Sequence, residues 1–244
     1  MKSRKLIADR MLEGIVVINK PKGITSHDVV DRVRRKFGMR RVGHAGTLDP
    51  LATGVLVILL GKSTKLFGQF ETFDKDYRAT LILGQKTTTA DVEGAVLACA
   101  GYHDVTREKV IDVFQTFIGE TEQTPPMVSA VKVKGSRLYQ LARKGIEVKR
   151  EARKIVISDL ALLRFAPPKV EFKVACSKGT YVRQLAEDIG EKLGTVACIA
   201  EIERTKVGPF HIDDSVTLEA AAESDIRPWD PRVLPMDTVS GKIF

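Results

Sequence analysis

The chain has 244 residues, 43% of them hydrophobic and 29% charged, which suits a globular protein with one large core or two modest domains and excludes a disordered chain. No apolar run approaches the roughly 20 residues that a membrane-spanning helix needs, and the basic N-terminus lacks the apolar stretch of a signal peptide. We therefore expect a cytoplasmic protein with no membrane partner. Cys99, Cys176 and Cys198 form no CxxC pair, which predicts three small buried side chains rather than a disulfide framework or a zinc site.

The formal net charge of +8 is unevenly distributed along the chain. Residues 1–41 hold 12 Lys and Arg against 4 Asp and Glu, and residues 131–154 hold 9 against 2, whereas residues 201–244 hold 5 against 9. Two concentrated basic segments indicate a polyanionic partner, and nucleic acid is the commonest one. A solvated basic face without a partner is the alternative that charge alone leaves open.

The first half of the chain shows hydrophobic periods and turn residues that predict strands and helices in alternation with loops. They are a buried strand at residues 14–19, a helix that Ser26 caps and Gly38 ends, a loop at 40–54, a strand at 55–60, a short helix at 62–73 and a strand at 77–83.

The second half is predicted in the same way, from a helix that Thr106 caps to a last strand near residue 207. The elements are that helix, ending at Gly119, strands at 128–133, 155–165 and 170–176, a helix at 182–193 and a strand at 199–207. Strands outnumber helices and do not alternate regularly with them. This order predicts an α+β fold with a mixed, largely antiparallel sheet and flanking helices.

The strongest candidate site is the loop at residues 43–54, GHAGTLDPLATG. Its glycines let the backbone approach a ligand closely, and Pro50 fixes the chain directly after Asp49. A carboxylate mounted in such a loop can act as a nucleophile or as a general base. The residues alone also allow a structural Asp that accepts backbone N–H bonds in a turn.

Two other clusters carry weaker signals. Residues 176–183, CSKGTYVR, join a strand to a helix, and Arg183 adds positive charge at a helix N-terminus, where it is able to pair with a carboxylate. An ordinary surface arginine is the alternative. In the second cluster, Tyr77 stands between Asp76 and Arg78; an aromatic ring beside a cation suits base stacking, whereas a lone Tyr on a strand is more often part of the core.

Five successive segments resemble, in order, the motifs of the TruB-type tRNA pseudouridine synthases. They are residues 19–28 (NKPKGITSHD), 43–54, 75–83 (KDYRATLIL), 124–132 (TPPMVSAVK) and 177–190 (SKGTYVRQLAEDIG). The resemblance runs from about residue 14 to about residue 212. Five ordered motifs are far more specific than any one of them.

This resemblance implies the mixed-sheet catalytic fold of pseudouridine synthases and a reaction that needs no cofactor and no metal. The implied reaction converts the T-loop uridine of tRNA (position 55) to pseudouridine after the base is extruded from the RNA. Asp49 matches the catalytic aspartate, which attacks the nucleotide while the C–N glycosidic bond is exchanged for a C–C bond. Tyr77 matches the tyrosine that stacks on the base and is a candidate for proton removal at C5. Arg183 matches the arginine that pairs with the catalytic carboxylate.

The resemblance also implies a set of substrate-binding residues around the catalytic ones. His44 matches a histidine near the flipped nucleotide, and Ile202 stands where the family usually has a Leu against the base. Lys20 matches a motif lysine whose role we take as structural or supporting. Tyr181 and Lys65 complete the predicted substrate-binding set. The segment at residues 132–154, which includes Tyr139, is expected to lie against the RNA backbone.

The domain prediction places a catalytic domain at residues 1–212 and a C-terminal extension at 213–244, without the complete second RNA-binding domain of many relatives. The predicted partner is the T-stem-loop of tRNA, and we expect a monomer. Cys198, Val128 and Glu203 depart from the family pattern, which concerns RNA contacts rather than the chemistry.

Three alternatives stand beside this interpretation. A non-catalytic tRNA-binding or tRNA-folding protein would have lost the nucleophile, whereas Asp49 is present. A guide-RNA-dependent relative is expected to carry a C-terminal RNA-binding domain. An Asp-dependent glycosidase normally needs a second carboxylate flanking the bond, and no such pair is evident near Asp49.

Overall fold

The computed structural model describes residues 13–129, 132–133, 135–138, 141, 145–146, 148–223 and 234. The chain divides into two compact units. The first comprises Met1–Tyr77 and Glu203–Phe244, and the second comprises Arg78–Ile202. The boundaries fall within strands β4 (Lys75–Leu83) and β12 (Ala197–Val207), so each of these strands contributes residues to both units. The predicted Tyr139 contact with RNA lies outside the described residues, as does most of the C-terminal extension.

The first unit is built on strands in the order β14-β1-β3-β12. β1 and β3 are antiparallel, and β2 is also antiparallel to β3, whereas β14 is parallel to β1 and β12 is parallel to β3. The strands are β1 (Gly14–Lys20), β2 (Val42–Ala45), β3 (Thr53–Leu60), β12 (Ala197–Val207), β13 (Phe210–His211) and β14 (Val216–Thr217). Nearly every side chain of β1 and β3 is buried, as the continuous apolar runs of the sequence predict.

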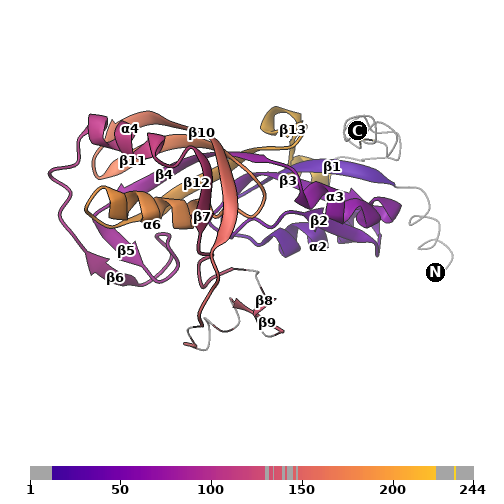
Figure 1. Cartoon of the computed structure of the whole chain (residues 1–244). Helices are drawn as coiled ribbons and strands as arrows, with labels where there is room; N and C mark the ends of the chain where they lie inside the picture. The colour runs from indigo at the N-terminus through magenta and orange to yellow at the C-terminus, as the bar shows by residue number, and fades with distance from the viewer. Residues whose placement is uncertain are drawn as a thin grey trace. The chain divides into compact units, whose positions relative to one another are not determined.

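Helix α2 (Ser26–Phe37) packs against β2 in the first unit (Figure 1). Thr25, not Ser26, is its N-cap: the Thr25 hydroxyl accepts from the backbone of Asp28, whose carboxylate accepts from the Thr25 backbone in return. Ser26 is the first helical residue, and its side chain bonds to the backbone of Leu48 instead. The helix ends at Gly38 with φ of 61°, a left-handed conformation that glycine adopts at low cost.

The short helix predicted in the first unit differs from the observed structure. The helix predicted at 62–73 is a 3-10 turn followed by one turn of α-helix, and β2 lies inside the segment predicted as a loop. The elements are η1 (Gly61–Leu66), α3 (Phe67–Glu71), η2 (Ile212–Asp214) and α7 (Leu218–Glu223). Phe70 of α3 stacks on Phe210 with ring centroids 5.8 Å apart, which ties α3 to the buried cluster that includes Val55 and Val57.

The second unit contains strands in the order β4-β11-β10-β7. β10 is antiparallel to both of its neighbours. Helix α4 packs on β10 and on α6, and the β5–β6 and β8–β9 hairpins form separate two-stranded sheets. The elements are β4 (Lys75–Leu83), β5 (Gln85–Thr87), β6 (Val96–Cys99), α4 (Arg107–Gln115), β7 (Gly119–Gln123), β8 (Lys132–Val133), β9 (Ser136–Arg137), β10 (Arg153–Ala166), β11 (Lys169–Cys176) and α6 (Val182–Lys192).

The α+β prediction with a mixed, largely antiparallel sheet is confirmed. Three further details were wrong: α4 ends at Gln115 and not near Gly119, Val128 is not in a strand, and Cys99 is exposed. Cys176 and Cys198 are buried as expected. Among the described residues, no helix is both long and apolar enough to cross a membrane.

Candidate active site

Asp49 lies in the turn between β2 and β3 of the first unit. Leu48 and Leu51 on either side are buried, whereas Asp49 is half-buried and Pro50 is exposed. The N–H of Ala52 donates to the Asp49 carbonyl at 3.1 Å and closes the turn. Because the apolar neighbours anchor the turn in the core, the chain presents the carboxylate from a fixed backbone.

Lys20, at the end of β1, supports the turn through a hydrogen bond to its backbone. Its side chain is fully buried, and its ammonium donates to the carbonyls of Pro21 at 2.8 Å, Ile24 at 2.7 Å and Pro50 at 3.4 Å. A buried ammonium must be compensated by strong acceptors, so the charge holds residues 21–24 and the turn together. This position fits the supporting role expected for Lys20; its contact with substrate stays a prediction.

Ser26 holds the residue that precedes Asp49. Its hydroxyl donates to the Leu48 carbonyl at 3.0 Å and accepts from the Leu48 N–H at 2.8 Å, and both residues are buried. The start of α2 is thereby attached to the turn through a reciprocal pair of hydrogen bonds. Such a pair satisfies two backbone groups that burial would otherwise leave unpaired.

Arg204 on β12 is a further support, and the sequence pattern gave no role to it. The side chain is 2% exposed, and its guanidinium donates to the carbonyls of Val55 at 2.8 Å, Thr47 at 3.3 Å and Gly46 at 3.0 Å. Gly54, with φ of 98°, lets β12 approach, because a Cβ there would lie 2.2 Å from the Arg204 carbonyl oxygen. The planar fork of an arginine suits several acceptors at once.

His44 lies on β2, next to the turn. Its Nδ1 is buried with no hydrogen-bond partner among the described residues. Burial lowers the pKa of the imidazole below its ordinary value of 6.5, and the positive charge of Arg204 lowers it further. His44 is therefore neutral at pH 7, which suits a residue that contacts a base rather than a phosphate.

The remaining predicted site residues of the first unit are Tyr77 and Lys65. Tyr77 is half-buried on β4, and Lys65 is exposed on η1. In the second unit, Tyr181 precedes α6 and Ile202 is partly buried on β12. The substrate contacts expected of these four residues stay predictions.

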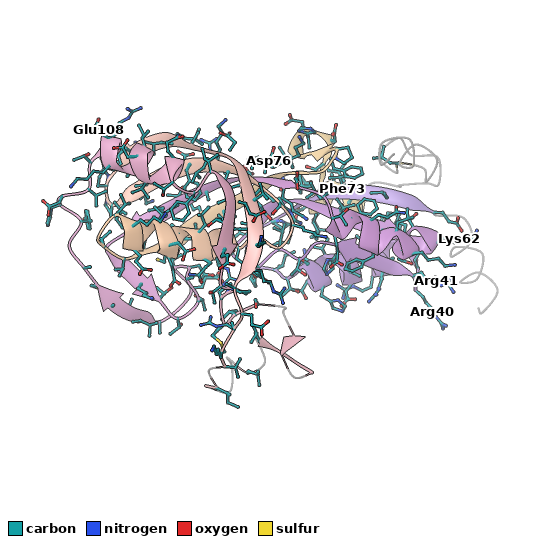
Figure 2. The ribbon with its side chains drawn as sticks, in the orientation of Figure 1. Arg40, Arg41, Lys62, Phe73, Asp76 and Glu108 are labelled. Carbon is teal, nitrogen blue, oxygen red and sulfur yellow. The ribbon has the colours of Figure 1, made fainter. Side chains whose placement is uncertain are left out.

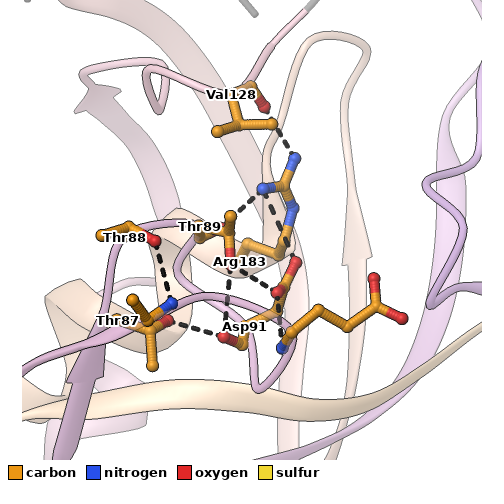
Figure 3. Close-up of polar contacts among 8 residues, drawn as sticks. Thr87, Thr88, Thr89, Asp91, Val128 and Arg183 are labelled. Atoms are coloured by element: carbon orange, nitrogen blue, oxygen red, sulfur yellow. Dashed lines mark hydrogen bonds and ion pairs between the residues drawn. The ribbon is translucent and has the colours of Figure 1, made fainter. Parts of the chain in front are cut away.

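Arg183, the second residue of α6, is the centre of a buried polar network in the second unit (Figure 3). It is 4% exposed, and its guanidinium donates to the carbonyls of Thr89 at 2.6 Å and Val128 at 2.8 Å. The Asp91 carboxylate lies 3.8 Å from Nη1. Arg183 is thus built into the unit and is not an ordinary surface arginine. Its predicted pairing with Asp49, a residue of the first unit, stays a prediction.

The loop that holds Arg183 is itself shaped by Asp91. One carboxylate oxygen accepts from the Thr89 hydroxyl at 2.5 Å and from the Glu93 N–H at 3.1 Å (Figure 3). Ala90 between them has φ of 61°, which is unfavourable for a residue with a Cβ. Strain of this kind persists only where surrounding contacts determine the backbone, and here it directs the Thr89 carbonyl to Arg183. No group of three or more potential metal ligands occurs in the described part of the chain.

Comparisons with known proteins identify the family. Residues 34–182 match the N-terminal domain of the TruB family pseudouridylate synthases, and residues 183–239 match the tRNA pseudouridylate synthase B C-terminal domain. The chain belongs to the TruB family of pseudouridylate synthases. It is therefore an isomerase of the pseudouridine synthase class, as the motifs predicted, and the non-catalytic alternative is not favoured.

Relatives within the TruB family cover most of the chain. The tRNA pseudouridine synthase B of Syntrophotalea carbinolica is 49% identical over 209 residues, 86% of this chain and 68% of its own length. The enzyme of the same name from Opitutus terrae is 43% identical over 225 residues, 92% of this chain and 93% of its own.

Solved structures agree with this assignment. A chain of the Cbf5-Nop10-Gar1 complex superimposes with a TM-score of 0.74 at 29% identity, over 95% of this chain and 63% of that one. A chain of an H/ACA RNP bound to a substrate RNA containing 2′-deoxyuridine superimposes with a TM-score of 0.70 at 25% identity, over 97% of this chain and 63% of that one. This chain thus spans less than two thirds of those proteins.

Proposed function

We propose that the chain converts the T-loop uridine of tRNA to pseudouridine and that Asp49 is its nucleophile. The observation that carries the proposal is the triple support of the Asp49 turn by Lys20, Ser26 and Arg204. Three buried side chains bonded to one short turn fix its backbone, and a preorganised group is what covalent catalysis needs. The names of the 43–49% identical relatives support tRNA as the substrate.

The proposed reaction begins when the target nucleotide leaves the RNA stack, since a base inside a folded loop is not accessible. The Asp49 carboxylate attacks the nucleotide, and the bond between N1 and C1′ breaks. The uracil rotates, C5 forms a bond with C1′, and the bond between Asp49 and the nucleotide breaks, which regenerates the carboxylate. The proton on C5 is then removed and N1 is protonated, so that product and substrate have the same atoms and no oxidant or co-reactant is required.

Roles follow for the neighbouring side chains. Tyr77 stacks on the base, which compensates part of the few kcal/mol that extrusion costs, and is our candidate for removing the C5 proton. Neutral His44 contacts the flipped nucleotide. Ile202 excludes water that would otherwise hydrolyse a covalent intermediate. Arg183 is proposed to pair with the Asp49 carboxylate and to orient it; no metal or cofactor enters the scheme.

A basic surface on the first unit supports an RNA partner. Arg40, Arg41 and Lys62 are exposed at the same end of that unit (Figure 2), where the Gly61 N–H donates to the Arg41 carbonyl at 2.9 Å. Cations clustered on one face contact phosphates and make binding depend on salt. With the basic segment at 131–154, this surface is proposed to hold the tRNA body, and the enzyme is proposed to act as a cytoplasmic monomer.

A guide-RNA-dependent activity is the second candidate, because the H/ACA structures share the fold. Sequence identity favours tRNA as the substrate, because this chain is 49% identical to a tRNA pseudouridine synthase B and 29% identical to the chain of the Cbf5-Nop10-Gar1 complex. Activity on tRNA without any guide RNA separates the two.

The test uses an unmodified tRNA transcript, the protein alone and no guide. Pseudouridine is mapped by base-specific chemistry and sequencing. We expect product at the T-loop uridine and none in a transcript with cytidine there. Product at another uridine, or none unless a guide RNA is added, would contradict the proposed substrate. Binding of the same transcript should weaken steeply with salt, because Lys and Arg contacts release counterions; a flat dependence would remove the basic surface from the proposal.

A further inference from the structure

Gln123, the last residue of β7, is joined to the start of α6 by its side-chain amide. The side chain is buried, at 4% exposed. Its Nε2 donates to the Tyr181 carbonyl at 3.2 Å, and its Oε1 accepts from the Tyr181 N–H at 2.8 Å. Both backbone groups of one residue are thus bonded to a single amide that lies 58 positions away in the sequence.

Tyr181 is the N-cap residue of α6, and its side chain makes no capping hydrogen bond. In a capping box, a Glu or Gln of the same helix accepts from the N-cap N–H. Here Gln123 does this from a different strand. The Tyr181 carbonyl also accepts the first helical bond, from the Leu185 N–H at 3.0 Å. Gln123 therefore fixes the first turn of the helix, in which Arg183 is the second residue.

The segment that follows Gln123 also contacts Arg183. Residues 124–128 run from Gln123 to Val128, whose carbonyl accepts from the Arg183 guanidinium at 2.8 Å. Pro125 and Pro126 restrict the backbone between these points, and Arg150 donates to the Pro125 carbonyl at 3.1 Å. The segment at 124–128 is thus attached to α6 at both ends, by Gln123 at one and by Arg183 at the other.

We propose that Gln123 is a positioning residue for Arg183, because it fixes both the helix start that carries Arg183 and the segment whose Val128 carbonyl accepts from the guanidinium. The inference rests on the proposed function, because it takes Arg183 as a participant in the chemistry. Removal of the amide frees the helix N-terminus and the segment together. Arg183 then keeps its charge but loses a fixed place, so the chemical step slows while the affinity for tRNA changes little.

The substitution Gln123→Met keeps the length of the side chain and removes both hydrogen bonds. Under single-turnover conditions with saturating enzyme, we expect the rate constant to fall by about 10- to 100-fold, with the Kd for tRNA within about threefold of wild type. Gln123→Glu retains the oxygen that accepts from Tyr181 and should recover part of the rate. If the Met variant does not fold, the rate of Gln123→Glu provides the test in its place. Gln184→Met is the matched control: it removes the bond from Gln184 to Asp188 on the same helix and should leave the rate near wild type.

A double-mutant cycle with Arg183→Lys separates positioning from a general structural role. If Gln123 acts through Arg183, the double variant is no slower than Arg183→Lys within about threefold, because the lysine has already lost the bidentate geometry. Rates that multiply, or a Gln123 variant with a wild-type rate beside a slow Arg183 variant, overturn this inference alone. A wild-type rate for Arg183→Lys would contradict the role of Arg183 in the proposed function itself.

Discussion

The Ser26 hydroxyl and the Leu48 backbone form a closed pair of hydrogen bonds, one donated at 3.0 Å and one accepted at 2.8 Å. Through this pair the first residue of α2 determines where the residue before Asp49 lies. The predicted nucleophile is therefore positioned by a helix that begins 23 positions earlier in the sequence.

Ser26→Ala should weaken both the fold and the chemistry. It leaves a buried N–H and a buried carbonyl of Leu48 without their partner, which we expect to lower the free energy of unfolding by about 1–3 kcal/mol. The turn can then shift, and the single-turnover rate should fall by about tenfold or more. Urea denaturation and a pseudouridine assay measure the two effects. Thr25→Ala, which removes only the cap of α2, is the control; equal rate losses in the two variants would contradict a specific role for Ser26.

Arg204→Met should destabilise the fold strongly, although Arg204 is far from Asp49 in the sequence. Three backbone carbonyls lose a donor, and we expect the free energy of unfolding to fall by about 2–4 kcal/mol. Arg204→Lys keeps the charge but cannot reach all three carbonyls, so it should be intermediate. Lys206→Met on the same strand is the control. An unchanged urea midpoint for Arg204→Met would show that the guanidinium does not hold the turn.

The environment of His44 predicts a pH effect with a definite sign. Burial, and then the charge of Arg204, lower its pKa in the folded protein below 6.5, so the unfolded chain binds more protons between the folded pKa and 6.5. The stability contribution is therefore complete above pH 6.5 and is lost as the pH falls toward the folded pKa. An NMR titration, with His44→Gln to assign the signal, measures the value. A pKa at or above 6.5 would contradict the buried, neutral imidazole.

Asp91→Asn tests the network around Arg183. The amide retains an oxygen for the Thr89 hydroxyl and the Glu93 N–H but removes the charge opposite a guanidinium that is 4% exposed. We expect the single-turnover rate to fall by about 10- to 100-fold, because loss of a buried partner leaves the charge uncompensated. Glu93→Gln, an exposed carboxylate of the same loop, should have little effect. If the two variants behave alike, the Asp91 charge has no specific role.

The sequence predicted what depends on local pattern. Continuous apolar runs predicted β1 and β3, and a helical period with Gly38 at its end predicted α2. Where the apolar pattern was weak, the prediction of secondary structure failed. Gly43 and His44 interrupt the apolar pattern of β2, so this strand was predicted as part of a loop. Cys99 was expected to be buried as cysteines usually are, but all of β6 is exposed in a two-stranded hairpin.

At the candidate site too, the sequence predicted the features that depend on local pattern and missed those that depend on contacts between distant residues. The glycines and the proline around Asp49 predicted a functional loop, and that role stays a prediction. Arg204 and Gln123 were missed, because each acts on a backbone far away in the sequence, 158 positions from Gly46 and 58 positions from Tyr181. A side chain that bonds to main-chain carbonyls imposes no pattern on its partners, so only the fold reveals it.

The central claim, that Asp49 is the nucleophile, is tested most directly by Asp49→Asn in a single-turnover assay of pseudouridine formation on unmodified tRNA transcript. The amide has nearly the shape of the carboxylate but is a far weaker nucleophile. We predict that the variant binds the transcript with a Kd within about threefold of wild type, unfolds at the same urea concentration and forms no product. Pseudouridine formation by Asp49→Asn at a rate near that of the wild type would contradict the account.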